Sequence, residues 1–369
     1  MRLLIRMHMQ GWLRLRLHLR LKAKIMRQSN PSRARTLAAL MIIAIAAVIA
    51  SYLATIGHIG ASSAEPQQSS GVLYGPQMVE ANYCPFGNPS GNSSDTAYIY
   101  LPPSSRNETL PLVIIVHGGG WHTGSAFNVT YARIEKYATN SSALPANSYY
   151  IAPALLKDNF IVATINYRLA PQYPFPAQII DLKCAVRYFR ANAARYGINP
   201  NEIGVVGSSA GGQLVQLLAL TSNSSLWSSG PYANYSSRVE AVVDNFGPSN
   251  LTWYEYHNSS SAQINEYRTQ DLSEVFMDNY TLLSIASPIN YIGANEPPFL
   301  IFQGNKDTTV PPYQSYALYN SLIEHGDNAT LVIVNNSGHS FSQAGQYPIN
   351  PSIPQIEGIT ASFLKEKLG

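Results

Sequence analysis

The segment Gly207-Ser208-Ser209-Ala210-Gly211 constrains the fold of this chain more than any other feature of its sequence. The apolar run Ile203–Gly207 leads into it and predicts a buried β-strand, and the run Gly211–Leu220 follows it and predicts a helix. A chance turn rich in glycine and serine can have the same five residues. A serine between a strand and a helix, however, is typical of a nucleophile elbow. We therefore predict that Ser209 is a nucleophile at the start of a helix whose amides face developing negative charge.

Short apolar runs bounded by turn residues recur along the rest of the chain and predict further strands. Most are continuous rather than alternating, which is typical of parallel strands covered on both faces. Helical patterns fall between them, and this alternation predicts an α/β fold with a doubly wound sheet. The expected strands are Ala97–Leu101, Leu112–Val116, Phe160–Asn166, Ile203–Gly207, Ala241–Phe246, Phe299–Gln303 and Thr330–Val334. The expected helices are a segment opened by Pro176 and closed by Gly197, then Gly211–Leu220, Pro312–His325 and Ile356–Leu368.

Two stretches, Ser125–Lys157 and Asn250–Asn290, do not fit the alternation of strands and helices. Both carry N-x-Ser/Thr sequons, which are typical of surface segments. We interpret them as cap or lid insertions of a single domain.

A second glycine motif, His117-Gly118-Gly119-Gly120-Trp121, follows the expected strand Leu112–Val116. Glycines at a strand end let main-chain N–H groups approach a substrate oxygen with no Cβ in the way. We predict that the amides of Gly118 and Gly119, together with that of Ala210, form an oxyanion hole. A flexible glycine turn also explains the three glycines, but not their place at a strand end upstream of the elbow.

A nucleophilic serine needs a base and a carboxylate that orients the base. His339 lies in a turn after the strand Thr330–Val334, and Asp307 lies in a polar turn after the strand Phe299–Gln303. The order Ser209, Asp307, His339 is the hydrolase order and favours these two residues, although Asp307 in such a turn is also suited to capping it. Asp244, at the end of another strand, is the reserve candidate for the acid.

The charges of the chain divide at residue 64. Residues 1–64 hold ten basic residues and no acidic one, whereas the remainder holds 14 basic and 21 acidic residues, so the overall net charge of +3 hides two unlike parts. The acidic balance of the second part excludes a basic domain that binds nucleic acid. Its apolar content is sufficient for a sizeable core.

A run of twenty uncharged residues, Leu37–Ile56, is long enough as a helix to cross a bilayer. The basic residues all precede it, which predicts a cytoplasmic N-terminus and an extracytoplasmic C-terminal part. The run is either a retained membrane anchor, which we favour, or a signal segment cleaved near Ser62-Ser63-Ala64. The expected organisation is a basic segment over 1–36, a transmembrane or signal segment over 37–56, a linker over 57–75 and a catalytic domain over 76–369.

Eleven sequons after the apolar run agree with an extracytoplasmic location and predict a glycoprotein. The two cysteines, Cys84 and Cys184, either pair as a disulfide in an oxidising compartment or leave Cys184 as an ordinary buried helix residue. Two thiols cannot supply a four-thiolate zinc site. The sequons lie at Asn92, Asn107, Asn128, Asn140, Asn223, Asn234, Asn250, Asn258, Asn279, Asn328 and Asn335.

Several motifs in order resemble the hormone-sensitive-lipase-like and feruloyl-esterase-like carboxylesterases of the α/β-hydrolase superfamily. They are HGGGW, NYRLAPQYPFPAQIIDLKCAVRYFRANAARYGINPNEIGVVGSSAGG, PPFLIFQGNKDTTVPPYQS and SGHSF, and the resemblance runs through about residues 95–365. It implies an α/β-hydrolase fold, with a mostly parallel eight-stranded sheet flanked by helices, and carboxylic ester hydrolysis without a cofactor or a metal.

By motif, the resemblance assigns the nucleophile to Ser209, the acid to Asp307 and the base to His339. The oxyanion donors are Gly118, Gly119 and Ala210. The sequence departs from the family at Ser208, where an acidic residue is frequent, and at Ser340, where glycine is common. Neither departure removes a catalytic group, but both bear on substrate preference.

We expect a membrane-anchored or secreted serine esterase that acts on a small-molecule ester. One alternative is a serine peptidase on the same fold, although no propeller domain precedes the hydrolase core. The other is a non-catalytic binding protein with this fold. Such a protein would be free to lose the triad, yet Ser209, Asp307 and His339 are all present.

Overall fold

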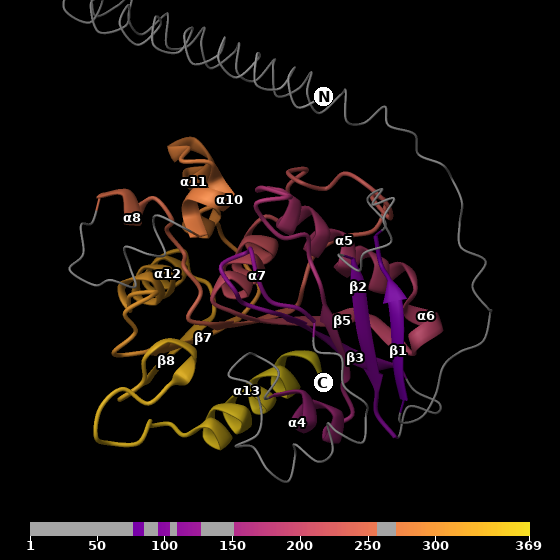
Figure 1. Ribbon diagram of the computed structural model, residues 1–369. Coiled ribbons are helices and arrows are strands. Elements are labelled where there is room, and N and C mark those ends of the chain that lie inside the picture. Colours follow the sequence, from indigo (N-terminus) through magenta and orange to yellow (C-terminus); the bar gives the residue numbers. More distant parts are fainter. Residues whose placement is uncertain (1–76, 85–94, 104–108, 127–150, 257–270) are drawn as a thin grey trace, which may run out of the picture. The chain divides into compact units, whose positions relative to one another are not determined.

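An eight-stranded sheet forms the centre of the part of the chain that the computed structural model describes, which is residues 77–84, 95–103, 109–126, 151–256 and 271–369 (Figure 1). The strands lie in the order β1-β2-β4-β3-β5-β6-β7-β8. β1 and β2 run antiparallel to each other, β2 runs antiparallel to β4, and the strands from β4 to β8 are parallel. Their bounds are β1 Gln77–Asn82, β2 Thr96–Leu101, β3 Leu110–Val116, β4 Ile161–Ile165, β5 Ile198–Ser208, β6 Ala241–Asn245, β7 Phe299–Gly304 and β8 Ala329–Val334.

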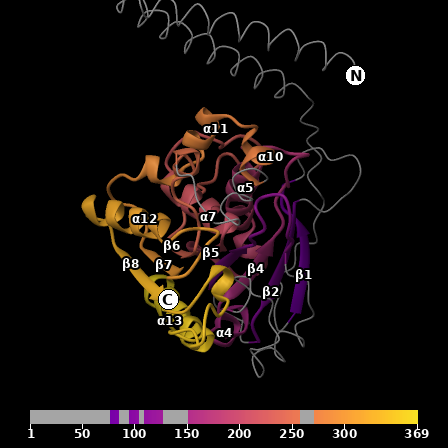
Figure 2. The same ribbon diagram turned by 60° about the vertical axis from the view of Figure 1, so that its left-hand side comes forward.

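Helices cover both faces of this sheet (Figure 2). On one face lie α4 (Ala152–Lys157) and α13 (Ile353–Leu368), and on the other lie α5 (Ala177–Ala191), α7 (Ala210–Leu220) and α12 (Tyr313–Glu324). The apolar strands are buried on both sides, as in β3, where Ile114 belongs to one core cluster and Ile115 to the other. The remaining elements are α6 Ala193–Tyr196, α8 Trp253–Tyr256, α10 Ser273–Phe276, α11 Tyr280–Ile285 and two 3₁₀ turns, η4 Pro288–Tyr291 and η5 His339–Phe341.

The predicted strands and helices are confirmed, with small shifts at their ends. β1, a half-exposed strand at the antiparallel edge of the sheet, is not among the strands expected from the sequence. The helix expected between Pro176 and Gly197 consists of α5 and the short α6, and Gly197 ends it in the left-handed conformation, with φ 69°.

The two predicted insertions differ in the parts that the structure describes. Residues 127–150 of the first lie outside the described residues, and its end is corrected: α4 packs against β4 and α13, so it is a flanking helix rather than part of a lid. The second contributes α8, α10 and α11. Its Phe276 contacts the rings of Trp121 and Phe175, so this insertion packs on the segment that follows β3.

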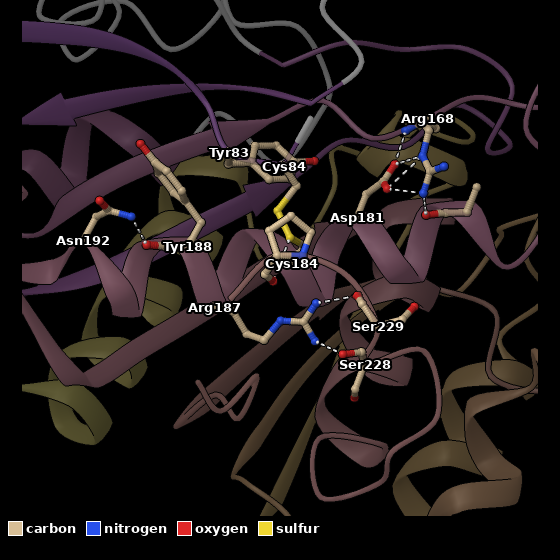
Figure 3. Close-up of a disulfide and its surroundings, with 12 residues drawn as sticks. Tyr83, Cys84, Arg168, Asp181, Cys184, Arg187, Tyr188, Asn192, Ser228 and Ser229 are labelled. Carbon is tan, nitrogen blue, oxygen red and sulfur yellow. Dashed lines mark hydrogen bonds and ion pairs between the residues drawn. A yellow bond between two sulfur atoms is a disulfide. The ribbon is translucent and has the colours of Figure 1, made fainter. Parts of the chain in front are cut away.

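A disulfide joins Cys84, after β1, to Cys184 in the middle of α5 (Figure 3). This decides between the two interpretations of the cysteines. Both residues are fully buried. Nearby, Asp181 of α5 forms an ion pair of 2.6 Å with Arg168, which precedes the helix. Arg187, also of α5, donates hydrogen bonds to the backbone carbonyl groups of Ser228 and Ser229.

The basic segment 1–36, the apolar run 37–56 and the linker 57–75 lie outside the described residues. The sequons at Asn92, Asn107, Asn128, Asn140 and Asn258 lie outside them as well. Within the part that is described, we find no helix with both the length and the apolar character needed to cross a membrane.

Candidate active site

Ser209 occupies the turn between β5 and α7. Its backbone takes φ 54° and ψ −120°, a conformation that non-glycine residues rarely adopt and that occurs where structure is strained for function. The Ser209 N–H donates to the carbonyl of Asn245 at the end of β6, with an N–O distance of 2.9 Å. A Cβ on Gly207 would lie 2.2 Å from the carbonyl oxygen of Gly211, so the turn is too tight for a larger residue. These features are those of the predicted nucleophile elbow.

His339 lies in η5, after β8, and faces Ser209. Its Nε2 is 3.1 Å from the Ser209 Oγ, and its Nδ1 is 2.8 Å from Oδ2 of Asp307. Because a carboxylate only accepts hydrogen bonds, Nδ1 carries the proton, and Nε2 of the neutral ring is left to accept from the serine hydroxyl.

The carboxylate of Asp307 is oriented by the turn that follows β7. Its Oδ1 accepts the backbone N–H groups of Thr309 and Val310, each at 2.9 Å, and the side chain is fully buried. Oδ2 remains directed at His339. Burial and the negative charge of Asp307 together raise the pKa of the neighbouring Tyr254 well above its ordinary value.

The reserve acid, Asp244, does not reach His339. Its Oδ1 accepts the Gly247 N–H at 3.0 Å, and its Oδ2 accepts the Gln216 side-chain amide at 2.9 Å, beneath α7. Burial raises the pKa of Asp244 to about 8. The alternation of strands placed Asp244 at the same edge of the sheet as Asp307, but of these two carboxylates it is Asp307, in the turn after β7, that contacts the histidine.

The loop after β3 approaches the elbow closely. A Cβ on Gly118 would lie 2.9 Å from the Ser208 carbonyl oxygen and 3.3 Å from Cβ of Ser209, so a glycine is needed for this approach. The Nδ1–H of His117 donates to the Gly118 carbonyl at 2.7 Å. Since a trans peptide directs its C=O and N–H oppositely, this bond aims the Gly119 N–H away from His117.

His117 is buried and stacks on Tyr167, with ring centroids 4.2 Å apart. Burial lowers the pKa of His117 to about 4, so the ring stays neutral near pH 7. The Tyr167 hydroxyl donates to the His117 carbonyl at 3.0 Å. Both contacts fix the start of the glycine loop. Ala210, the third expected oxyanion donor, is the first residue of α7, where backbone N–H groups have no intrahelical partner.

Three further residues near the site were missed from the sequence. Phe246 follows β6, and its ring lies edge-on to the His339 imidazole, with centroids 4.8 Å apart. His122 pairs with Asp271 of the second insertion at 2.5 Å. The apolar run Ala241–Phe246 includes Phe246 as a strand residue, and its place at the end of that strand was the signal available. The His122 pair spans 149 residues and has no sequence signal.

Among the residues the structure describes, no group of three or more His, Cys, Asp or Glu side chains is arranged to hold a metal ion.

The BD-FAE family model matches residues 98–322, which include the glycine loop, the elbow and the loop of Asp307. The chain belongs to the BD-FAE family. Esterase LipQ of Mycobacterium tuberculosis is 27% identical over 298 residues, which is 78% of this chain and 66% of LipQ. The probable carboxylic ester hydrolase LipM of the same organism is 29% identical over 223 residues, 60% of this chain and 47% of LipM. The match thus spans only about half to two thirds of these relatives.

Solved structures share the fold of this BD-FAE member. A truncated carbohydrate esterase from gut microbiota has a TM-score of 0.59 at 26% identity, over 80% of this chain and 99% of that chain. An esterase from the archaeon Pyrobaculum calidifontis has a TM-score of 0.56 at 24% identity, over 73% of this chain and 81% of that chain. The fold is therefore that of the α/β-hydrolases, as the sequence predicts.

Proposed function

We propose that this protein is a serine hydrolase that cleaves carboxylic esters through an acyl-enzyme intermediate. The observation that carries the proposal is the hydrogen-bonded series from Ser209 Oγ through the His339 ring to Asp307, with distances of 3.1 Å and 2.8 Å. A base within hydrogen-bond reach of a strained serine, itself oriented by a buried carboxylate, is the arrangement that nucleophilic catalysis requires.

In the first step, the Ser209 Oγ attacks the ester carbonyl carbon while its proton moves to Nε2 of His339. The carbonyl π electrons move to the oxygen, and the resulting oxyanion accepts hydrogen bonds from the amides of Gly118, Gly119 and Ala210. Asp307 stabilises the imidazolium through its bond to Nδ1.

The tetrahedral intermediate then collapses. The bond from carbon to the alcohol oxygen breaks, and His339 gives its Nε2 proton to the departing alcohol. In the second half, His339 removes a proton from water, and the oxygen of that water attacks the acyl carbon to give a second tetrahedral intermediate. The bond from carbon to Ser209 Oγ then breaks, His339 returns the proton to Oγ, and the carboxylic acid is released.

Ester rather than amide hydrolysis is supported by the family and by the names of the relatives. LipQ is described as an esterase, LipM as a probable carboxylic ester hydrolase, and the gut-microbiota protein as a carbohydrate esterase. A panel of acetylated sugars, feruloyl esters and p-nitrophenyl esters with C2–C12 acyl chains, beside matched amides, defines the substrate. Turnover of the amides alone would favour a peptidase.

The test of the proposal is the substitution Ser209→Ala. It should abolish hydrolysis of short p-nitrophenyl esters and covalent labelling by a fluorophosphonate probe, while circular dichroism shows an unchanged fold. Ser208→Ala is the matched control, because Ser208 is the buried neighbour of the proposed nucleophile and its Oγ accepts a hydrogen bond from the Asn245 side-chain amide at 3.2 Å. Undiminished turnover in Ser209→Ala would refute the assignment.

We also propose that the catalytic domain is extracytoplasmic. It is either anchored in the membrane by residues 37–56 or secreted after this segment is cleaved off. The disulfide between Cys84 and Cys184 supports this, because disulfides persist in oxidising compartments. Protease treatment of intact cells that carry the full chain should degrade the catalytic domain. A domain protected until the cells are lysed would contradict the proposal.

A further inference from the structure

Gln213 is a buried residue in the first turn of α7, four positions after the proposed nucleophile. Its side-chain Oε1 accepts the indole N–H of Trp121 at 3.0 Å, and its Nε2 donates to the carbonyl of Ala286 at 2.7 Å. Its backbone N–H donates to the Ser209 carbonyl at 3.0 Å. One residue therefore contacts the nucleophile, the glycine loop and the second insertion.

Trp121 ends the glycine loop that holds the proposed oxyanion donors. Its side chain is 1% exposed, and its ring lies edge-on to that of Phe276, with centroids 5.4 Å apart. The start of the loop is held separately, by the bond from Tyr167 to His117. The indole-to-amide bond thus connects the far end of the loop to the helix that begins next to Ser209.

We propose that Gln213 is a positioning residue of the oxyanion hole, which holds the glycine loop at Trp121 in register with the nucleophile helix. The proposal rests on the proposed function, because an oxyanion hole has a role only in acyl transfer. Two of the proposed donors lie in the glycine loop after β3, and the third, the Ala210 N–H, lies in α7. The three amides can bind one oxyanion together only if contacts between the loop and the helix hold them in place.

The chemistry of Gln213 fits this task better than a role in packing alone. An apolar side chain fills a core position without the cost of burying an amide. Here the amide uses its acceptor on one element and its donor on another, which requires the full carboxamide. A misplacement of about 1 Å in a catalytic group can cost roughly 100-fold in rate. Loss of the hydrogen bond between Trp121 and Gln213 should therefore lower the rate of turnover more than it weakens substrate binding.

The experiment compares Gln213→Met with Gln216→Met in the full chain. Gln216 lies one turn further along α7, is equally buried, and donates to Asp244 at 2.9 Å and to the Gly247 carbonyl at 3.2 Å. The two variants lose a similar number of hydrogen bonds, but only the first loses contact with the glycine loop. The readouts are kcat and KM for p-nitrophenyl acetate and the second-order rate constant of labelling by a fluorophosphonate.

Gln213→Met should lower kcat and the labelling rate constant by roughly 10- to 100-fold and leave KM within about twofold. Gln216→Met should change them little. Equal losses of kcat in the two variants, or a raised KM with unchanged kcat in Gln213→Met, would overturn the inference.

Trp121→Phe tests the same bond from its other side and serves if Gln213→Met fails to fold. It should reproduce the loss in kcat, and the double variant should be no slower than either single variant because one interaction is removed in both. Gln213→Glu, which keeps an acceptor for Trp121, should retain more activity than Gln213→Met. Independent, additive losses would contradict a shared role.

Failure of this inference is distinguishable from failure of the proposed function. A wild-type protein that neither hydrolyses esters nor reacts with the fluorophosphonate refutes both. An active wild type with indistinguishable Gln213→Met and Gln216→Met variants refutes the positioning role alone.

Discussion

Asp307 and His339 share a hydrogen bond of 2.8 Å between Oδ2 and Nδ1. The second oxygen of the carboxylate is fixed by two backbone N–H groups, so the acid cannot turn away from the imidazole without losing both bonds. This geometry sets the tautomer of the histidine and leaves its Nε2 to accept the proton of Ser209.

We predict that Asp307→Asn lowers kcat for a short p-nitrophenyl ester by roughly 10³- to 10⁴-fold. An amide nitrogen facing Nδ1 donates rather than accepts, so the histidine takes the tautomer with its proton on Nε2. That nitrogen can then no longer accept the proton of Ser209. Steady-state kinetics checks the expectation.

Asp244→Asn is the matched control, since Asp244 is also a buried aspartate at the end of a strand in this sheet. Its contacts are to Gly247 and Gln216, so the variant should keep most of the activity. If both variants lose activity equally, the role of Asp307 is not specific to the histidine.

The second prediction concerns the dependence of stability on pH. Burial raises the pKa of Asp244 from 3.8 to about 8, so between these values the folded protein binds a proton that the unfolded chain has released. The free energy of unfolding therefore falls as pH rises through this range, by up to about 1.4 kcal/mol per pH unit from this group. Above about pH 8 the effect is complete.

Asp244→Asn lacks this titration. Urea denaturation at pH 5, 6.5 and 8 should show the stability of the variant increasing relative to wild type at each step. Parallel pH profiles for the two proteins would show that Asp244 does not carry the effect.

The fold was predictable because its signals are local. Continuous apolar runs separated by helical patterns gave the parallel strands, and the pentapeptide around Ser209 marked the junction between β5 and α7. The edge strand β1 was missed because it is half-exposed, and its residues form no clear apolar run.

The proposed catalytic residues could be selected from their places after the strands and from their order along the chain. The contacts that position them could not be predicted in this way. In the sequence, Gln213 is only a polar residue within an apolar helix. Its contact with Trp121, which lies 92 residues earlier in the chain, is formed by the fold. The choice between Asp307 and Asp244 likewise depended on which loop faces the histidine.

The third prediction concerns the disulfide. Replacing Cys84 and Cys184 together with alanine should lower the free energy of unfolding by about 2–5 kcal/mol, because the bond closes a loop with a sequence separation of 100 and restricts the unfolded chain. Denaturation of wild type with and without a reductant, beside the double variant, measures this. A reductant should not affect the variant. Free thiols in the unreduced wild type, found by alkylation and mass spectrometry, would contradict the expectation.

The last prediction assigns a role to Phe246. Its ring lies edge-on to His339 and also to Phe341, with centroids 4.8 Å and 4.9 Å apart, so it limits how far the imidazole can turn. Phe246→Leu should lower kcat several-fold, with little change in KM, and cost about 1–2 kcal/mol of stability.

Phe302→Leu separates the effect on His339 from a general loss of packing. Phe302 is a buried residue of the same core cluster, and its ring contacts that of Phe341, with centroids 6.2 Å apart. The control should lose similar stability in urea denaturation while keeping kcat close to wild type. If kcat falls equally in both variants, the loss reflects the packing of the cluster, and Phe246 has no particular role in holding the base against Ser209.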